Sequence, residues 1–170
     1  MPVYVGSTNW WWRDSTDSPA DCQAKSLART CGKNGEGTVL NDGSFVICVG
    51  AGAAWIMAPA STQVSDYWAG GQYNSTNVSS MPSVSCWPAL ETALTNAGLN
   101  PTDWFVPSYT QLQNPGYVCR DNWDFFVRGY WSSTKCNDTL AEALCYNSGS
   151  RCTRSKTTPL CVRAMRCVNY

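Results

Sequence analysis

Apolar positions recur with two periods along this chain, and the change of period separates predicted helices from predicted strands. After Ser18 and Pro19, apolar side chains recur at helical spacing as far as Cys31, and Gly32 follows them. Serine caps helix starts, proline is tolerated in the first turn, and glycine is common just after a helix end. The pattern therefore predicts a short amphipathic helix over 19–31.

The next segment, 37–59, has the composition and the turns of strands. Three runs rich in β-branched or apolar residues are separated by Asn41-Asp42-Gly43 and by Gly50-Ala51-Gly52. Such turns predict a meander of antiparallel strands. Residues 60–85 are rich in Ser, Thr, Asn and Gly, and we expect them to form a long surface excursion.

Two more helices are predicted in the middle of the chain. One covers about 87–97, because Pro88 lies in its first turn and Gly98 follows its last apolar position. The other is short: Ser108-Tyr109-Thr110-Gln111 is a capping box, in which serine and glutamine satisfy backbone N–H groups at a helix start. This third helix is expected to end near 114–116, where Asn-Pro-Gly interrupts it.

Two predicted strands carry the polar groups of the last third of the chain. Tyr130-Trp131-Ser132-Ser133-Thr134 is typical of a core strand, and its hydroxyls are expected to bond nearby backbone groups. The final strand is expected to run unbroken over 159–168, with Arg163 and Arg166 on opposite faces. An arginine in such a strand usually holds carboxylates or loop carbonyls with its planar fork, so we expect structural roles for both.

A hairpin is predicted between these two strands. Residues 140–146 and 152–154 have strand character, and Asn147-Ser148-Gly149-Ser150 joins them. If Ser148 and Gly149 are the two loop residues, Cys145 and Cys152 face each other across the strands. We expect a disulfide between them.

The length and composition fit a single α+β domain. The chain has 170 residues, of which 44% are hydrophobic, enough to bury one core. We assign residues 1–17 to an N-terminal arm and 18–170 to the domain. The arm contains Trp10, Trp11 and Trp12, which cannot all face one core because neighbours on a strand point to opposite faces. Two interpretations stay open: a strand packed on both faces, or an arm that docks on a partner.

The charge pattern and the absence of histidine exclude several function classes. Charged residues make up 14% of the chain and the net charge is zero, so the basic footprint of a nucleic-acid-binding protein is missing. No apolar run approaches the roughly 20 residues of a membrane span, and we expect no membrane insertion. Without histidine, the usual general base and imidazole-based zinc sites are also missing. We therefore predict no catalytic residues, no metal and no cofactor.

Ten cysteines point to an oxidising environment. Secreted domains use disulfides as staples, whereas the cytosol keeps thiols reduced. The even count allows five bridges. The first residues lack the basic and apolar regions of a signal peptide, which leaves two explanations: a removed leader, or a virion component that meets oxidant after lysis. Met1 followed by an extended Pro-Val-Tyr-Val favours the virion, so we expect a virion-surface or extracellular location.

Three motifs in the last third resemble a known group of domains. They are Trp104 with Pro107-Ser108, then Tyr130-Trp131-Ser132-Ser133-Thr134, then Val162-Arg163-Ala164-Met165-Arg166. They resemble the C-terminal domain of Lcl-type bacterial adhesins and a related domain family of unknown function. Val106 and Gln111 depart conservatively from the family words. The resemblance covers roughly 37–170, because Ala58-Pro59 also matches, and it is most specific from Asp103 onward.

The resemblance implies a C-type-lectin-like fold, shared with formylglycine-generating enzymes and phage tropism proteins. This fold has a twisted antiparallel sheet, two or three short helices, long loops and several disulfides. Such folds commonly join the first helix to the last strand, which implies a bridge from Cys86 to Cys161 or Cys167. Formylglycine-generating enzymes bind copper with a cysteine pair, but no spacing here selects such a pair.

The function that follows is recognition, because long loops on a rigid frame carry binding sites. We expect a non-enzymatic bacteriophage virion protein, capsid- or tail-fibre-associated and homo-oligomeric, that binds host glycan or a neighbouring virion protein. The alternative is a secreted bacterial adhesin domain that binds polysaccharide; zero net charge makes a polyanion the less favoured ligand. The candidate ligand-binding residues are Asn137, Asp138, Arg151 and Arg154.

One pair of carboxylates could contribute oxygen ligands to a calcium site. Asp121 and Asp124 lie three residues apart, and calcium prefers several hard oxygen ligands. The sugar-binding calcium motifs of animal C-type lectins are not present in the sequence. We expect a surface turn with a buried Trp123 at this place.

Overall fold

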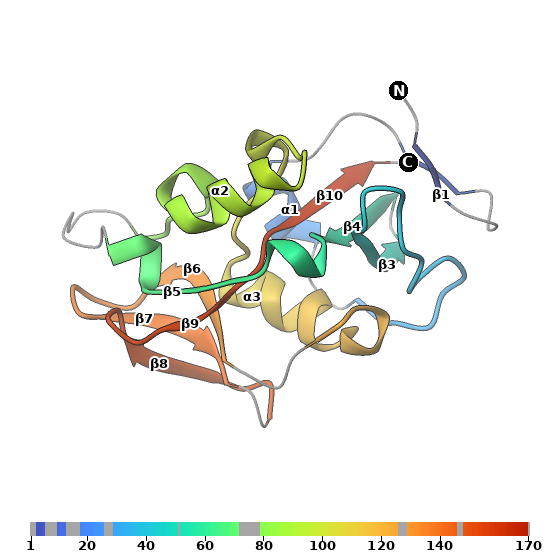
Figure 1. Ribbon diagram of the computed structural model, residues 1–170. Coiled ribbons are helices and arrows are strands. Elements are labelled where there is room, and N and C mark those ends of the chain that lie inside the picture. Colours follow the sequence, from blue (N-terminus) through green and yellow to red (C-terminus); the bar gives the residue numbers. More distant parts are fainter. Residues whose placement is uncertain are drawn as a thin grey trace.

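The computed structural model is a mixed α+β structure with short helices and strands arranged in three sheets (Figure 1). It describes residues 3–5, 10–12, 18–25, 29–50, 52–71, 79–125, 129–145 and 148–169. The strands are β1 Val3–Val5, β2 Trp10–Trp12, β3 Phe45–Gly50, β4 Ala53–Met57, β5 Val64–Asp66, β6 Tyr130–Lys135, β7 Leu140–Leu144, β8 Arg151–Ser155, β9 Leu160–Val162 and β10 Met165–Asn169. The helices are α1 Pro19–Lys25, α2 Pro88–Asn96, α3 Tyr109–Gln111, the 3-10 turns η2 Ala60–Thr62, η3 Trp68–Gly71, η4 Val84–Cys86, η5 Pro101–Asp103 and η7 Arg120–Asn122, and the π-helical η6 Leu112–Tyr117.

The three-stranded sheet, in the order β10-β4-β3, is buried on both faces. Ala54 and Ile56 belong to one core cluster, together with Leu90 of α2. Trp55 and Met57 point to the opposite face and belong to a second cluster. Because alternate residues of a strand face opposite sides, β4 joins the two clusters. Burial on both faces explains why the sequence of β4 is apolar throughout.

The five-stranded sheet has the order β5-β9-β6-β7-β8. Most neighbours are antiparallel, but β6 and β9 are parallel, with Tyr130 opposite Cys161. The sheet is therefore mixed, and the wholly antiparallel sheet that we expected is wrong for this pair. Strand β6 also carries an irregularity between Trp131 and Lys135, where its register against β7 shifts.

The last strand is not continuous. β9 belongs to the five-stranded sheet and β10 to the three-stranded sheet, and Arg163 and Ala164 form the step between them. The prediction of one unbroken strand over 159–168 is wrong because the chain changes sheets at this step. Figure 1 shows the red chain running from the lower sheet to the upper one.

Arg163 fixes this step through hydrogen bonds from all three nitrogens of its guanidinium group. Its Nε donates to the Ala58 carbonyl at 2.8 Å, Nη1 donates to Gln63 Oε1 at 3.2 Å, and Nη2 donates to Asp124 Oδ1 at 2.7 Å. The side chain is buried and its guanidinium also lies 5.4 Å from the ring centroid of Trp123. The structural role predicted for Arg163 is confirmed.

The helix starts follow the predicted caps, but the first helix is shorter than expected. Ser18 Oγ accepts the Asp21 N–H and also bonds the Asp21 carboxylate, which lowers the pKa of Asp21. Helix α1 ends at Lys25, and the chain at 29–33 is not helical. The reason is tertiary: Arg29 Nη1 donates to Gly50 O and Lys33 Nζ donates to Val49 O, so this segment is fixed to β3.

The second and third helices confirm their sequence signals. Helix α2 begins at Pro88 in its first turn, and Gly98 follows it with a positive φ of 77°. Ser108 and Gln111 form the complete capping box at α3. The backbone leaves helical geometry at Asn114, at the predicted end near 114–116, and a further helical turn reaches Tyr117 beyond this kink.

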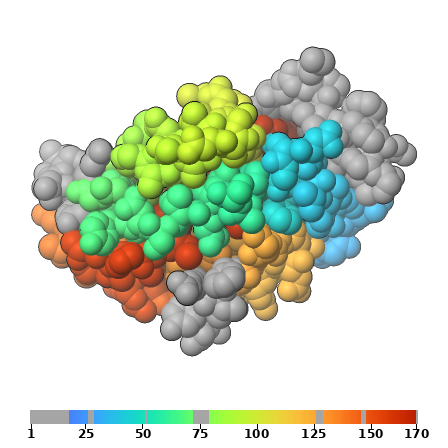
Figure 2. All heavy atoms as spheres, viewed as in Figure 1, coloured from blue at the N-terminus to red at the C-terminus, as the bar shows by residue number. Residues whose placement is uncertain are grey.

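The first part of the predicted surface excursion over 60–85 does lie at the surface, but it is tied to the frame by a strand and by a buried tryptophan. Strand β5 pairs with β9 at the edge of the five-stranded sheet, and Trp68 is buried against Trp87 at a centroid distance of 5.9 Å. Trp68 Nε1 donates to Ser132 O at 2.9 Å. The space-filling view shows the segment after β4 crossing one face of the molecule, between α2 above and the red C-terminal part of the chain below (Figure 2). Residues 72–78 lie outside the described residues.

Three disulfides are formed: Cys22–Cys167 and Cys31–Cys119 join distant parts of the chain, and Cys145–Cys152 lies within one hairpin. Five bridges were allowed by the count, whereas Cys48, Cys86, Cys136 and Cys161 lie outside these three. The expected bridge from Cys86 to Cys161 or Cys167 is wrong. The last strand is bridged to α1, because Cys22 of that helix faces Cys167 of β10.

The hairpin disulfide forms between the predicted cysteines in a different register. Leu144 pairs with Arg151 and Ala143 pairs with Cys152, so Cys152 lies diagonally across from Cys145. The Cys145 N–H donates to Ser150 O. The loop is therefore longer than the two residues expected. A diagonal pair on one face of a hairpin is still close enough for a bridge, and the Cα atoms are 5.8 Å apart.

Candidate functional site

The predicted ligand residues Asn137 and Asp138 lie in the turn between β6 and β7 and are exposed. Asn137 Oδ1 accepts the Thr139 and Leu140 N–H groups at 2.9 and 2.8 Å, which closes the turn. Asp138 Oδ1 lies 3.3 Å from Lys135 Nζ. The Asn137 side chain therefore shapes the turn, and the Asp138 carboxylate is the more accessible group.

Lys156 fixes the same turn from the other side. Its Nζ donates to the Asp138 carbonyl at 2.9 Å and lies 4.8 Å from the ring centroid of Trp68. Lys156 is buried, and this desolvation lowers its pKa. Lys156 is therefore a structural group of this turn.

The predicted ligand residues Arg151 and Arg154 lie on opposite faces of β8, because they are three positions apart on a strand. Arg151 lies 3.6 Å from Glu142 and its guanidinium stacks 4.4 Å from the ring centroid of Tyr109. Arg154 donates to Thr153 O and to the sulfur of Cys145. The structure does not bring these two arginines together into one site.

The predicted docking residues Trp10, Trp11 and Trp12 form strand β2, which pairs with β1 in a two-stranded hairpin. Trp12 is opposite Val3, and Trp10 is opposite Val5. The structure describes the backbone pairing of this hairpin but not its side chains. The pairing shows that the arm has its own strand partner.

The carboxylates considered for calcium have other surroundings. Trp123 is buried, as predicted, and its Nε1 donates to Gly116 O at 2.9 Å. Asp124 bonds Arg163, whereas Asp121 is exposed on η7. Among the residues that the structure describes, no group of three or more histidine, cysteine, aspartate or glutamate side chains could hold a metal ion.

A groove of about 850 Å³ lies elsewhere, on the side of the molecule formed by α2 and the start of α1. Four segments line it: the start of α1, the segment around η4, one side of α2, and η5 with the residues that follow it. The lining residues are Ser18, Pro19, Pro82, Ser83, Val84, Ser85, Glu91, Thr95, Pro101, Thr102, Asp103, Trp104 and Phe105. We call this the α2 groove.

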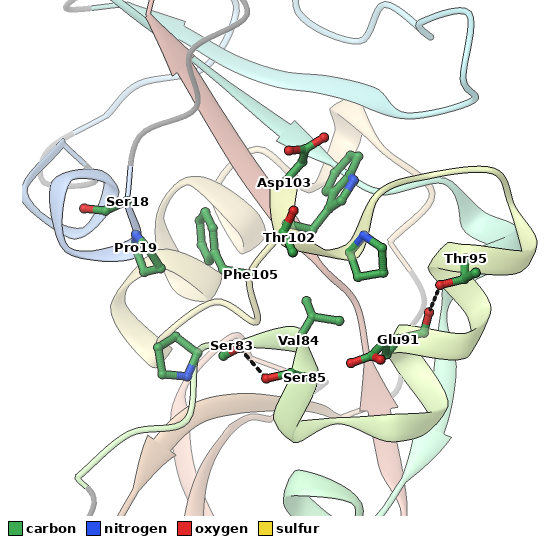
Figure 3. Close-up of a pocket in the computed structure, with 13 residues that line it drawn as sticks. Ser18, Pro19, Ser83, Val84, Ser85, Glu91, Thr95, Thr102, Asp103 and Phe105 are labelled. Carbon is green, nitrogen blue, oxygen red and sulfur yellow. Dashed lines mark hydrogen bonds between the residues drawn. The ribbon is translucent and has the colours of Figure 1, made fainter.

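The two long walls of the α2 groove are polar. Figure 3 shows Thr102 and Asp103 across the groove from Ser83, Ser85 and Glu91. Glu91 projects from α2, whereas Asp103 ends η5. The lining residues include two carboxylates and no lysine or arginine, so the α2 groove is an acidic place on a chain of zero net charge.

Aromatic and apolar side chains lie between these walls. Trp104 and Phe105 line the α2 groove through small exposed parts of their rings, because both are more than nine-tenths buried. The guanidinium of Arg166 lies 5.4 Å from the Trp104 ring centroid. Burial lowers the pKa of Arg166, and the carboxylates of Asp42 and Asp103 act in the opposite direction. Trp104 is thus held in place by the core and by Arg166.

The position of Trp104 and Phe105 is fixed by backbone bonds to two neighbouring segments. Phe105 and Met165 exchange both of their backbone hydrogen bonds at 2.9 Å. The Val106 N–H donates to Pro82 O at 2.8 Å, which places η4 beside η5. The walls of the α2 groove therefore belong to the rigid frame of the molecule.

Sequence reasoning missed the α2 groove. Glu91 lies on the outer face of a predicted helix and Asp103 lies in a predicted turn, and neither belongs to a binding motif. The sequence did single out the string from Asp103 to Ser108, but as a frame element. Only the folded chain brings η5 beside α2.

A scan of known family models finds no match to this chain, and a search of curated proteins finds no significant match. The resemblance therefore rests on the three motifs alone. In the structure these motifs supply Trp104 beside the α2 groove, the core strand β6 and the step at Arg163. No helix among the described residues has the length and hydropathy needed to cross a membrane.

Proposed function

We propose that this chain is a non-enzymatic recognition module and that the α2 groove binds a saccharide of a host or neighbouring surface. The observation that carries the proposal is a rigid groove with aromatic rings between two walls of hydroxyl and carboxylate groups. Saccharides present apolar C–H faces and many hydroxyl donors, so they suit a site with aromatic and acceptor groups. Pockets of this size commonly bind small ligands.

The module is further proposed to have the C-type-lectin-like fold and to act at a virion surface, associated with capsid or tail fibre and present as a homo-oligomer. The α+β class and the disulfide from the first helix to the last strand support the fold. Three disulfides support an oxidising location. A secreted bacterial adhesin domain is the alternative, and it shares the proposed saccharide site.

A blocking substitution tests the site. Ser85 is exposed at the mouth of the α2 groove, so Ser85→Trp would fill the groove without disturbing the core. Thr153→Trp, on exposed strand β8, is the matched control. With surface polysaccharides immobilised as probes, we expect Ser85→Trp to abolish binding and Thr153→Trp to leave it unchanged, at equal melting temperatures.

The same assay separates the α2 groove from the residues predicted by sequence. Alanine at Asn137, Asp138, Arg151 and Arg154 together should leave binding unchanged. If this variant loses binding while Ser85→Trp retains it, the ligand sits at the β6–β8 region and the α2 groove proposal is wrong. Location is tested separately: mass spectrometry of purified particles should detect this chain at many copies, and its absence there would eliminate the virion assignment.

A further inference from the structure

The backbone of the α2 groove offers a ligand few hydrogen-bond donors. The N–H groups of Thr102, Asp103, Trp104 and Phe105 all donate to other groups of the protein. Three further lining residues, Pro19, Pro82 and Pro101, have no N–H at all. The backbone of these walls therefore offers few donors to a ligand. The carbonyls of Pro82, Ser83, Val84, Pro101 and Phe105 also accept bonds within the protein, so the acceptors that face a ligand come mainly from side chains.

The hydroxyl groups of the lining residues are used in the same way. Ser18 Oγ donates to the Asp21 carboxylate, Thr95 Oγ1 donates to Glu91 O, and Thr102 Oγ1 donates to Asn100 Oδ1. Ser83 and Ser85 bond each other at 2.8 Å, which leaves one proton of that pair for a ligand. Each of these oxygens keeps lone pairs that can still accept.

The carboxylates of Glu91 and Asp103 add two acceptor groups that cannot donate when ionised. Among the described residues, neither carboxylate takes part in a hydrogen bond or ion pair. No lysine or arginine is among the lining residues, but Arg166, which lies against Trp104, interacts with the charge of Asp103. A ligand in the α2 groove thus meets the negative charge of Glu91 on one wall, and on the other wall the charge of Asp103, which Arg166 partly offsets.

We infer that the α2 groove selects saccharides that carry free amino groups, and that Glu91 and Asp103 are its specificity-determining residues. This inference rests on the proposed saccharide site. A protonated amine supplies three donors and a positive charge to an acceptor-rich wall. A sulfated or uronic-acid polysaccharide would place its own acceptors and negative charge against the same groups, which is unfavourable.

The recognition is assigned to a saccharide rather than to a basic peptide because of the backbone. Extended peptides commonly bind by adding a strand to exposed main-chain groups. Here the N–H groups from Thr102 to Phe105 are occupied, and those of the prolines do not exist. Side-chain oxygens and the exposed parts of the Trp104 and Phe105 rings remain. The oxygens suit the amines and hydroxyls of a sugar, and the aromatic rings suit its C–H faces.

The test measures binding of three oligosaccharides of equal length: a glucosamine oligomer with free amines, its fully N-acetylated form, and a sulfated form. Isothermal titration calorimetry is run at two salt concentrations with the complete chain. We expect the free-amine oligomer to bind at least tenfold more tightly than the acetylated one, and the sulfated one not to bind. The amine-dependent part should weaken with salt, because screening reduces charge attraction.

Variants then identify the groups responsible. Glu91→Gln and Asp103→Asn keep the shape of each side chain and remove its charge, and each should weaken free-amine binding about tenfold, as the loss of one charged contact does. Acetylated oligomer binding should change less than twofold. Asp121→Asn removes an exposed carboxylate far from the α2 groove in sequence and is the matched control, with no change expected.

The outcomes separate the inference from the proposed function. Equal binding of the free-amine and acetylated oligomers, unaffected by Glu91→Gln and Asp103→Asn but abolished by Ser85→Trp, would overturn the amine selectivity and keep the saccharide site. Binding of all three oligomers that survives Ser85→Trp would overturn the site itself and the inference with it. Failure of all three to bind would also overturn both. Capture of a lysine-rich peptide in preference to every oligomer would assign the groove to protein and overturn the saccharide assignment.

Discussion

Arg163 offers the sharpest test of how the frame is stabilised. Its buried side chain bonds Ala58 after β4, Gln63 before β5 and Asp124 after η7. We consider Arg163→Met, which puts an unbranched apolar side chain in place of the guanidinium, and Asp124→Asn, which keeps a hydrogen-bond acceptor. The structure predicts very different costs for the two changes. The difference arises because only one of the three bonds of Arg163 goes to Asp124.

The cost of Arg163→Met is dominated by a carbonyl that loses its donor. Ala58 is fully buried, and Arg163 Nε donates to its oxygen. A buried acceptor without a partner costs about 1–3 kcal/mol. Gln63 Oε1 keeps the Tyr130 hydroxyl as a donor at 3.0 Å. With the charged bonds and cation–π contacts added, we expect a total of about 3–5 kcal/mol.

The cost of Asp124→Asn is smaller. The Asp124 side chain is 41% exposed, so water screens its attraction to Arg163. Asparagine retains an oxygen that can accept the Arg163 Nη2 proton. We therefore expect a loss of about 1 kcal/mol.

The assay is reversible unfolding in urea, followed by tryptophan fluorescence, with the disulfides intact. In thermal unfolding, each kcal/mol corresponds to about 2–4 °C for a chain of this size, so Arg163→Met should lower the melting temperature by about 10 °C. Arg154→Met, on the exposed strand β8, is the control and should change stability by less than about 0.5 kcal/mol. If Asp124→Asn costs as much as Arg163→Met, the ion pair carries the stability and the argument from the buried Ala58 carbonyl is refuted.

Three further predictions use other features of the frame. Replacing both cysteines of Cys22–Cys167 by alanine should lower the free energy of unfolding by about 5 kcal/mol, and replacing both cysteines of Cys145–Cys152 should lower it by about 2.5 kcal/mol. The costs differ because the two bridges close loops of sequence separation 145 and 7. Equal urea midpoints for the two variants would contradict this account, which is based on loop entropy. Gly149→Ala should lower the free energy of unfolding by about 2–4 kcal/mol, because a Cβ there would overlap the Tyr117 ring. Gly52 has a similar positive φ but open space around it, so Gly52→Ala should cost only about 1–2 kcal/mol in the same unfolding assay. Burial raises the pKa of Cys48 above its ordinary value of 9.0, so the native state holds this proton while the unfolded state releases it, and stability should fall as the pH rises above about 9. Cys48→Ala should flatten that part of the pH profile, and an unchanged slope would show that another group titrates.

Local sequence signals determined the helix starts and the turns of this protein. Ser18, Pro88, Gly98 and the capping box at Ser108 act within a few residues, so the physical preference and the structure coincide. The hairpin turn also brought Cys145 near Cys152, although the loop length and therefore the register differ from the prediction. The burial of Trp123 and the structural role of Arg163 followed from residue type. A large ring is buried and a buried charge needs bonding partners wherever such residues lie in the chain.

Tertiary structure alone decided how distant segments meet. The step at Arg163 splits the last strand because one part completes each sheet, and no period in the sequence marks this change. Cys167 pairs with Cys22 because α1 packs beside β10, which spacing along the chain cannot reveal. The α2 groove depends on the same kind of contact: Glu91 and Asp103 lie on ordinary surface positions in the sequence, and they line one groove only because backbone bonds from Phe105 and Val106 fix η5 beside η4 and β10.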